Sequence, residues 1–109
     1  MLEALFGSKN RERVLQFILA NSQGYAKEIA DFYGTSLDPI QKQLERLEYN
    51  GVLISQKIGR TRLFSFNPRY VFLNELTALL EKARNYYPPE EIKRLTMRRK
   101  RPRRTGKPL

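Results

Sequence analysis

The apolar residues of the chain recur at helical spacing over most of its length, with one strand-like stretch in the middle. Residues 2–6 carry apolar side chains at i, i+3 and i+4, which predicts a brief leading helix. A longer helix should begin after Ser8, a good N-cap residue. A short helix should follow over about residues 26–33, and Gly34 suits its end.

The next helix has clear start signals. Asp38 can cap free backbone amides, and Pro39 suits the first turn, where its missing N–H costs nothing. Ile40, Leu44 and Leu47 then fall at i, i+4 and i+7, which predicts one buried stripe. The polar side chains between them are left off that stripe.

A hairpin is expected directly after this helix. Residues 53–57 and 62–66 are strand-like runs, and Gly59-Arg60 between them is a fair two-residue loop. Glycine at the first loop position permits a type II′ turn.

Asn67-Pro68 repeats the cap-then-proline signal and predicts a last long helix over about residues 68–86. The apolar face of this helix is wider than is needed to pack against a single surface. One part of it should cover the core of the same protomer, and the other part should pack against a second protomer. The expected homodimer interface comprises Leu2, Leu5, Phe72, Leu73, Leu76, Leu79, Leu80 and Ala83.

Length and charge divide the chain in two. The 109 residues suffice for one small domain. Residues 1–93 carry 13 basic and 11 acidic side chains, whereas residues 94–109 carry eight basic and no acidic ones. We therefore expect a folded domain over residues 1–93 and a basic, disordered tail over residues 94–109. A strongly basic tail binds phosphate groups, which occur in nucleic acids and on membrane surfaces.

The composition excludes several classes of function. The chain has no cysteine and no histidine, so disulfides, Cys/His zinc sites and histidine acid–base chemistry are unavailable. It carries no P-loop, GxGxxG motif or nucleophile–base pair, so we expect no enzyme, metal or cofactor. No apolar run could span a bilayer and no secretory signal is present, which predicts a cytoplasmic protein without a membrane partner.

The order of helix, helix, turn, helix, hairpin and helix over residues 8–86 resembles the winged helix-turn-helix domain of ArsR-like (arsenical-repressor-type) regulators. The matching segments are YAKEIADFYGTSLDPIQKQLERLEYNGVL and KIGRTRLFSFNP. The resemblance implies a mainly α fold with a small β-hairpin (α+β). It also implies a second paired helix in the major groove and a homodimer built by the last helix. The cysteine and histidine ligands of the metal-sensing members are missing.

The resemblance further implies which residues contact DNA. Gln41, Lys42 and Gln43 would approach base edges, where glutamine can pair with adenine and lysine with guanine or phosphate. Arg46 would contact the phosphates of the DNA backbone. The alternative is an ordinary solvated helix face. The full expected set on this helix is Ser36, Asp38, Pro39, Gln41, Lys42, Gln43 and Arg46.

Cations of the hairpin and the tail complete the predicted interface. The hairpin tip offers Lys57, Arg60, Thr61 and Arg62 for phosphate or minor-groove contact, with protection of an edge strand as the alternative. The tail weakly resembles an AT-hook, a segment that lies in the minor groove, but the central glycine of that motif is missing. Alternatively, the tail is disordered and only keeps the protein soluble. The expected contacts there are Arg98, Arg99, Lys100, Arg101, Arg103 and Arg104.

These features favour a homodimeric regulator that binds double-stranded DNA and acts as a repressor. Two alternatives stay open. One is RNA binding, since winged helices and basic tails also serve RNA, although the sequence identifies no exposed aromatic platform. The other is a module whose wide apolar helix recruits an unidentified protein partner.

Overall fold

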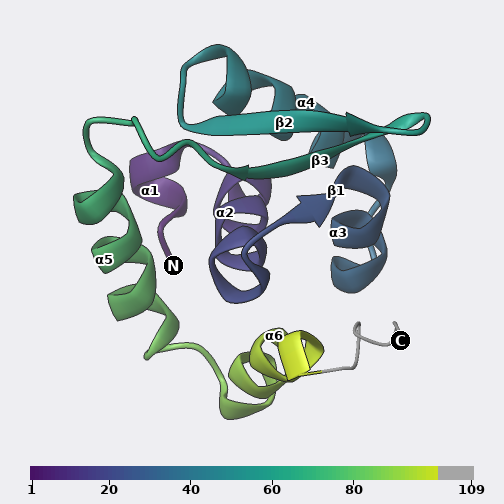
Figure 1. Cartoon of the computed structure of the whole chain (residues 1–109). Coiled ribbons are helices and arrows are strands. Elements are labelled where there is room, and N and C mark those ends of the chain that lie inside the picture. Colours follow the sequence, from purple (N-terminus) through teal and green to yellow (C-terminus); the bar gives the residue numbers. More distant parts are fainter. Residues whose placement is uncertain (101–109) are drawn as a thin grey trace.

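The computed structural model describes the backbone of residues 1–100 and the side chains of residues 1–97. The predicted architecture, mainly α with a small antiparallel sheet, is confirmed (Figure 1). In chain order the elements are α1 (Glu3–Phe6), α2 (Lys9–Asn21), β1 (Gly24–Tyr25), α3 (Ala26–Tyr33), α4 (Leu37–Tyr49), β2 (Leu53–Ile58), β3 (Thr61–Phe66), α5 (Leu73–Arg84) and α6 (Pro89–Lys100).

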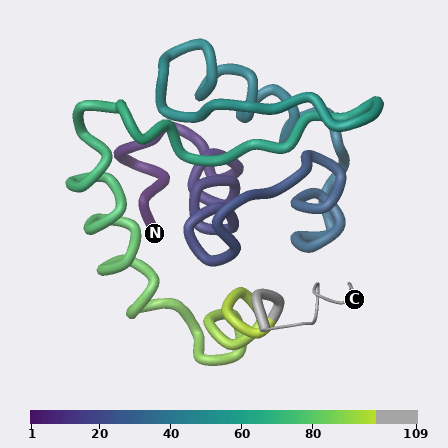
Figure 2. The backbone as a smooth tube through the Cα atoms, viewed as in Figure 1, coloured from purple at the N-terminus to yellow at the C-terminus, as the bar shows by residue number. Residues whose placement is uncertain are grey.

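Helix α2 lies at the centre of the fold, and the other five helices surround it (Figure 2). Ser8 caps it as expected, since its Oγ accepts a hydrogen bond from the Arg11 backbone N–H at 3.1 Å. Phe17 and Ile18 are fully buried. Gln16 is fully buried as well, and its Nε2 donates to the Leu80 carbonyl of α5 at 2.7 Å. Both apolar packing and a buried polar bond therefore join α2 to its neighbours.

The sheet has three strands in the order β1-β3-β2, one more than the sequence predicted. The extra strand is the two-residue β1, in which Gly24 pairs with Phe64 across the antiparallel β3. A Cβ on Gly24 would lie 3.0 Å from ring carbons of Phe17. Glycine at this position therefore lets β1 pass closely over α2.

The start of α4 differs from the prediction. Asp38 does not cap the helix, because α4 begins at Leu37 and Ser36 occupies the N-cap position with extended backbone. Asp38 instead lies in the first turn, where a negative charge still interacts favourably with the helix dipole. The preceding helix α3 ends as expected at Gly34, whose φ of +64° is left-handed.

The long helix predicted over residues 68–86 is also shorter than expected, because α5 begins only at Leu73. Asn67 does not act as its cap. Its Nδ2 donates to the Gly51 carbonyl at 2.9 Å, and its Oδ1 accepts from the Arg69 backbone N–H at 3.0 Å. Asn67 thus fixes a local turn beside the hairpin, and the chain makes further turns before α5 starts.

The domain boundary predicted after residue 93 is wrong, because it falls inside α6. This helix packs against α2, and its Leu95 is fully buried. Arg94 donates to the Phe32 carbonyl at 2.6 Å, and its guanidinium carbon lies 4.2 Å from the centroid of the Phe32 ring. Part of the segment expected to be a tail therefore belongs to the folded domain.

Two kinds of feature are absent from the described part of the chain. None of its helices is long and apolar enough to cross a membrane. Nor do its acidic side chains gather in a group of three or more that could hold a metal ion.

The burial of Leu95 gives a test of the revised boundary. We expect Leu95→Ala to lower the free energy of unfolding by about 2–5 kcal/mol, because it leaves a cavity between α6 and α2. Urea unfolding followed by circular dichroism measures the change. Met97→Ala is the matched control, since Met97 is exposed on the same helix and should change stability by less than about 0.5 kcal/mol. Equal effects of the two variants would contradict the placement of α6.

Candidate nucleic-acid interface

The outer face of α4 presents polar side chains to solvent, as the amphipathic pattern predicted. Gln41, Lys42 and Arg46 are exposed, while Ile40, Leu44 and Leu47 on the other face are buried. At the start of the helix Ser36 and Asp38 are exposed and Pro39 is half-buried. A helix with this arrangement can offer its polar face to a groove without disturbing the core.

Gln43 departs from the prediction. Its side chain is only 9% exposed, and its Oε1 accepts a hydrogen bond from Arg11 Nε at 2.8 Å. The same arginine donates through Nη1 to the Phe6 carbonyl at 2.6 Å. Gln43 therefore joins α4 to α2 and α1, and its assignment to the DNA-contacting face is wrong.

Lys42 on the exposed face has a partner within α4. Its Nζ lies 3.5 Å from Asp38 Oδ2, one helical turn earlier, and both side chains are well exposed. Exposed pairs of this kind contribute little to stability. A nearby phosphate could therefore replace the Asp38 carboxylate as the partner of Lys42 at small cost.

The hairpin tip is built as the sequence predicted. Ile58 pairs with Thr61, so Gly59-Arg60 is a two-residue loop, and Gly59 has a φ of +62°. Arg60 does not share this positive φ, which fits a type II′ turn. All four expected contact residues are exposed, namely Lys57, Arg60, Thr61 and Arg62. The tip projects beyond the rest of the molecule (Figure 1).

The register of the hairpin places two cations opposite each other. Lys57 on β2 pairs with Arg62 on β3, and Arg60 lies in the loop between them. No ion pair joins any of these three side chains to a carboxylate within residues 1–97. Like charges directly opposite on neighbouring strands destabilise a hairpin. An external anion at the tip would remove this repulsion.

Backbone and side-chain bonds fix the hairpin against α4. The Val52 N–H donates to the Leu47 carbonyl at 2.9 Å, and Ser55 Oγ donates to Glu48 Oε2 at 2.7 Å. Arg62 Nη1 in turn donates to Ser55 Oγ at 3.2 Å. The end of α4 and the basic hairpin are thus held as one unit.

The residues expected at a dimer interface divide into two groups. Leu2, Leu80 and Ala83 are buried in the protomer's own core and are corrected to core residues. Leu73 and Leu76 are half-buried. The apolar side chains that stay exposed include three of the expected set and two that the sequence did not single out: Leu5, Phe72, Leu79, Val71 and Tyr86.

The basic residues of the C-terminal segment lie at the limit of the described chain. The backbone of residues 98–100, which includes Arg98, Arg99 and Lys100, continues α6. Arg101, Arg103 and Arg104 lie outside the described residues, as do the side chains of residues 98–100.

Sequence reasoning missed Tyr49, the last residue of α4. Its side chain is 90% exposed at the joint between α4 and the hairpin. Its position off the Ile40, Leu44 and Leu47 stripe could have identified it as outward-facing. An exposed phenol beside the polar face adds a hydrogen-bonding group to the candidate interface.

Searches against known proteins give structural but no sequence matches. No family model matches the chain, and no curated protein sequence matches it. Among solved structures, reduced HlyU from Vibrio cholerae aligns with a TM-score of 0.59 at 16% identity, over 79% of this chain and 84% of HlyU.

Two further structures are similar to this chain. One is the homodimeric winged helix-turn-helix DNA-binding domain of Mb0332 from Mycobacterium bovis, a possible ArsR-family transcriptional regulator. It aligns with a TM-score of 0.58 at 17% identity, over 82% of this chain and 80% of that domain. The other is a mutant of ZitR from Lactococcus lactis in its apo form, with a TM-score of 0.53 at 18% identity, over 88% and 81% of the two chains. This chain has the winged helix-turn-helix fold.

Proposed function

We propose that the protein is a cytoplasmic, homodimeric transcriptional regulator that binds double-stranded DNA at specific sequences and acts as a repressor. In this role α4 enters the major groove, where Gln41 and Lys42 contact base edges. Arg46 and the hairpin cations contact the flanking phosphates. The similarity in fold to the Mb0332 DNA-binding domain supports this assignment.

The observation that carries the proposal is the uncompensated charge of the hairpin tip. Lys57 pairs with Arg62 across the two strands, and Arg60 lies in the loop that joins them. Among the described residues, no carboxylate forms an ion pair with these three cations. The tip is fixed to the end of α4, which presents exposed polar side chains. A cationic loop held next to a polar helix face suits double-stranded DNA, in which a row of backbone phosphates lies beside the base edges in the major groove.

A homodimer is supported by the apolar side chains that the protomer leaves uncovered. Phe72, the N-cap residue of α5, and Leu79, about two turns later on the same face, are 59% and 36% exposed, and Leu5 of α1 is 70% exposed. Burial of this face against a second copy would remove it from water. Two α4 helices related by a two-fold axis would then read half-sites about 34 Å apart or a multiple of that distance.

The C-terminal cations would add phosphate or minor-groove contacts. Arg94 fixes α6 to the Phe32 carbonyl near the end of α3, which directly precedes α4. Residues 101–109 carry further cations.

The role of the hairpin cations can be tested first. We expect Arg60→Ala to weaken DNA binding on all sequences, and to reduce the slope of log K against log salt by about one unit for each phosphate that the protein no longer neutralises. Fluorescence anisotropy of a labelled duplex over a range of salt concentrations measures this slope.

Arg69→Ala is the matched control, because Arg69 is also exposed but lies in the turn that follows β3, away from the hairpin tip. An unchanged slope for Arg60→Ala would refute the proposed contact between the hairpin and DNA phosphates. Competition with single-stranded and structured RNA at the same salt concentration would reveal the RNA-binding alternative if RNA displaces the duplex.

The second prediction separates the two glutamines of α4. After selection of a preferred duplex from a random library, Gln41→Ala should lose about 1–3 kcal/mol of discrimination at one base pair, because it removes a base contact. Gln43→Ala should instead lower the melting temperature, because it removes the bond to Arg11. Gln56→Ala on β2 is the exposed control for both measurements. Equal discrimination by wild type and Gln41→Ala would refute the base contact.

The third prediction tests the dimer. Phe72→Asp places a charge in the proposed interface and should convert the protein to a monomer in light scattering at micromolar concentration. The fold should survive, because Phe72 occupies the N-cap position of α5, which favours aspartate. Asn74→Asp adds the same charge on the far side of α5 and should leave the dimer intact. A monomeric wild-type mass would rule out the dimer altogether.

A further inference from the structure

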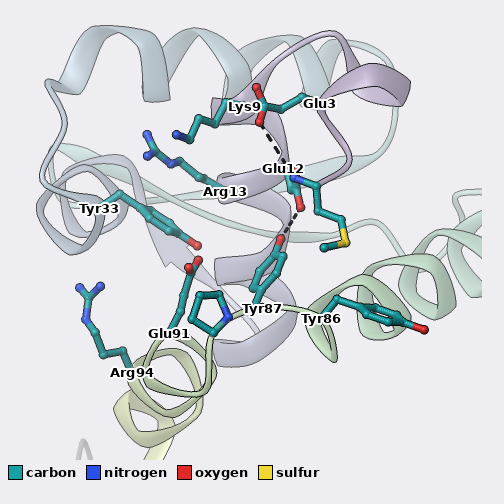
Figure 3. Close-up of a pocket in the computed structure, with 11 residues that line it drawn as sticks. Glu3, Lys9, Glu12, Arg13, Tyr33, Tyr86, Tyr87, Glu91 and Arg94 are labelled. Carbon is teal, nitrogen blue, oxygen red and sulfur yellow. Dashed lines mark hydrogen bonds and ion pairs between the residues drawn. The ribbon is translucent and has the colours of Figure 1, made fainter.

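A cleft of about 450 Å³ lies on the described surface, apart from the α4 face and the hairpin (Figure 3). Its walls come from the start of the chain, from α2, from the end of α3 and from the α5–α6 connection with α6. The lining includes Lys9, Glu12, Arg13, Tyr33, Tyr87 and Glu91. A volume of this size suits a small organic molecule.

The acidic group deepest in the cleft is already satisfied. Glu12 is only 4% exposed, and its Oε1 accepts from the Leu2 N–H at 2.7 Å and from the Met1 amino group at 3.2 Å. Its Oε2 accepts from the Tyr87 hydroxyl. Burial, followed by this hydrogen bond, raises the pKa of Tyr87, so the phenol stays protonated and keeps donating to Glu12. Glu12 and Tyr87 therefore form a fixed floor, and a ligand must bind to other groups.

Two cations and one carboxylate of the cleft make no ion pair among the described residues, although Arg13 Nη1 donates to Asn10 Oδ1 at 3.1 Å. Lys9 and Arg13 project from α2, and Glu91 projects from α6 on the other side of Tyr33 (Figure 3). Glu91 makes no ion pair with either cation among the described residues. Opposite charges thus line two walls of one cleft without neutralising each other.

Tyr33 lies between these walls and carries an unused hydrogen-bonding group. Its hydroxyl is buried and has no hydrogen-bond partner among the described atoms, although such groups are normally satisfied. The hydroxyl is a donor at neutral pH, as a phenol ordinarily is, and burial, followed by the nearby Glu91 carboxylate, raises its pKa further. The Arg13 guanidinium carbon lies 5.3 Å from the centroid of the Tyr33 ring, on the cationic side of the cleft.

We propose that this cleft binds a small zwitterion with an aromatic ring, of about the size of an aromatic amino acid, and that the ligand controls DNA binding. Its ammonium group would pair with Glu91, and its carboxylate with Lys9 and Arg13. The Tyr33 hydroxyl would bond the ligand between them, and the rings of Tyr33 and Tyr87 would pack against its aromatic ring. Control of DNA binding rests on the function proposed above, whereas ligand binding does not.

The position of Tyr33 provides the route to DNA binding. Tyr33 is the last residue of α3, and only three residues separate it from α4. A ligand held by Tyr33 and Glu91 would fix the end of α3 relative to α6. Such a ligand alters DNA affinity to the extent that it prefers one position of α4 over another, and DNA alters ligand affinity by the same factor.

Calorimetric titration of the full chain with L-phenylalanine tests the binding site. L-phenylalanine should bind, while N-acetyl-L-phenylalanine and L-phenylalaninamide should each bind about tenfold more weakly or worse, because each lacks one of the two charges. Absence of binding up to about 10 mM, or equal affinity of the three compounds, would overturn the proposal.

Two variants locate the site. Glu91→Gln should weaken L-phenylalanine binding by about tenfold, whereas Glu90→Gln, an exposed neighbour outside the cleft, should not change it. Tyr33→Phe should weaken binding and yet keep or raise the melting temperature, because it removes an unpartnered buried hydroxyl. Wild-type affinity in both Glu91→Gln and Tyr33→Phe would place any bound ligand elsewhere.

DNA affinity measured with and without saturating L-phenylalanine tests the control of binding. We expect a change of about fivefold or more. If the ligand binds but DNA affinity stays the same, the regulatory part is refuted and the DNA-binding proposal stands. If the protein binds no duplex at any salt concentration, the function proposed above fails, while the calorimetric result still decides whether the cleft binds the zwitterion.

Discussion

The burial of α2 on nearly all sides is the constraint on which the rest of the structure depends. A helix enclosed in this way must satisfy its polar side chains from other elements. Gln16 donates through Nε2 to the Leu80 carbonyl, although its buried Oε1 has no partner among the described residues, and Glu12 accepts from the Leu2 N–H and the Tyr87 hydroxyl. Arg11 completes the arrangement through Gln43 of α4. These bonds set the positions of α1, α4 and α5 around one helix, and thereby the position of the candidate DNA-binding face.

Local signals in the sequence predicted the elements that depend on local chemistry. The Ser8 cap, the end of α3 at Gly34 and the Gly59-Arg60 loop all follow from backbone preferences that act over a few residues, and the structure confirms them. The exposed side of α4 followed from the spacing of its buried stripe. The resemblance that predicted a winged helix-turn-helix was carried by this same local order of elements.

Features that depend on distant contacts could not be predicted in this way. Asn67 had the sequence of a helix cap, but its amide is used by the Gly51 carbonyl. The two-residue β1 exists only because β3 lies beside it. The basic composition after residue 93 predicted a tail outside the folded domain, and it gave no sign that Leu95 belongs to the core. Gln43 is different, since it stands three residues after Ile40 on the buried stripe, and the spacing could have identified it.

The hairpin cations have a second consequence that concerns solubility. β2 is one of the two edge strands of the sheet, and its Ile54 and Ile58 are 44% and 41% exposed, with Lys57 next to Ile58 in the chain. An open strand edge with apolar side chains can pair with the same strand of another molecule, and lysine on such an edge opposes that pairing. Removal of positive charge from this strand would therefore also favour intermolecular β-pairing and aggregation. The same side chains would then serve both nucleic-acid contact and colloidal stability, which limits how far either property can change alone.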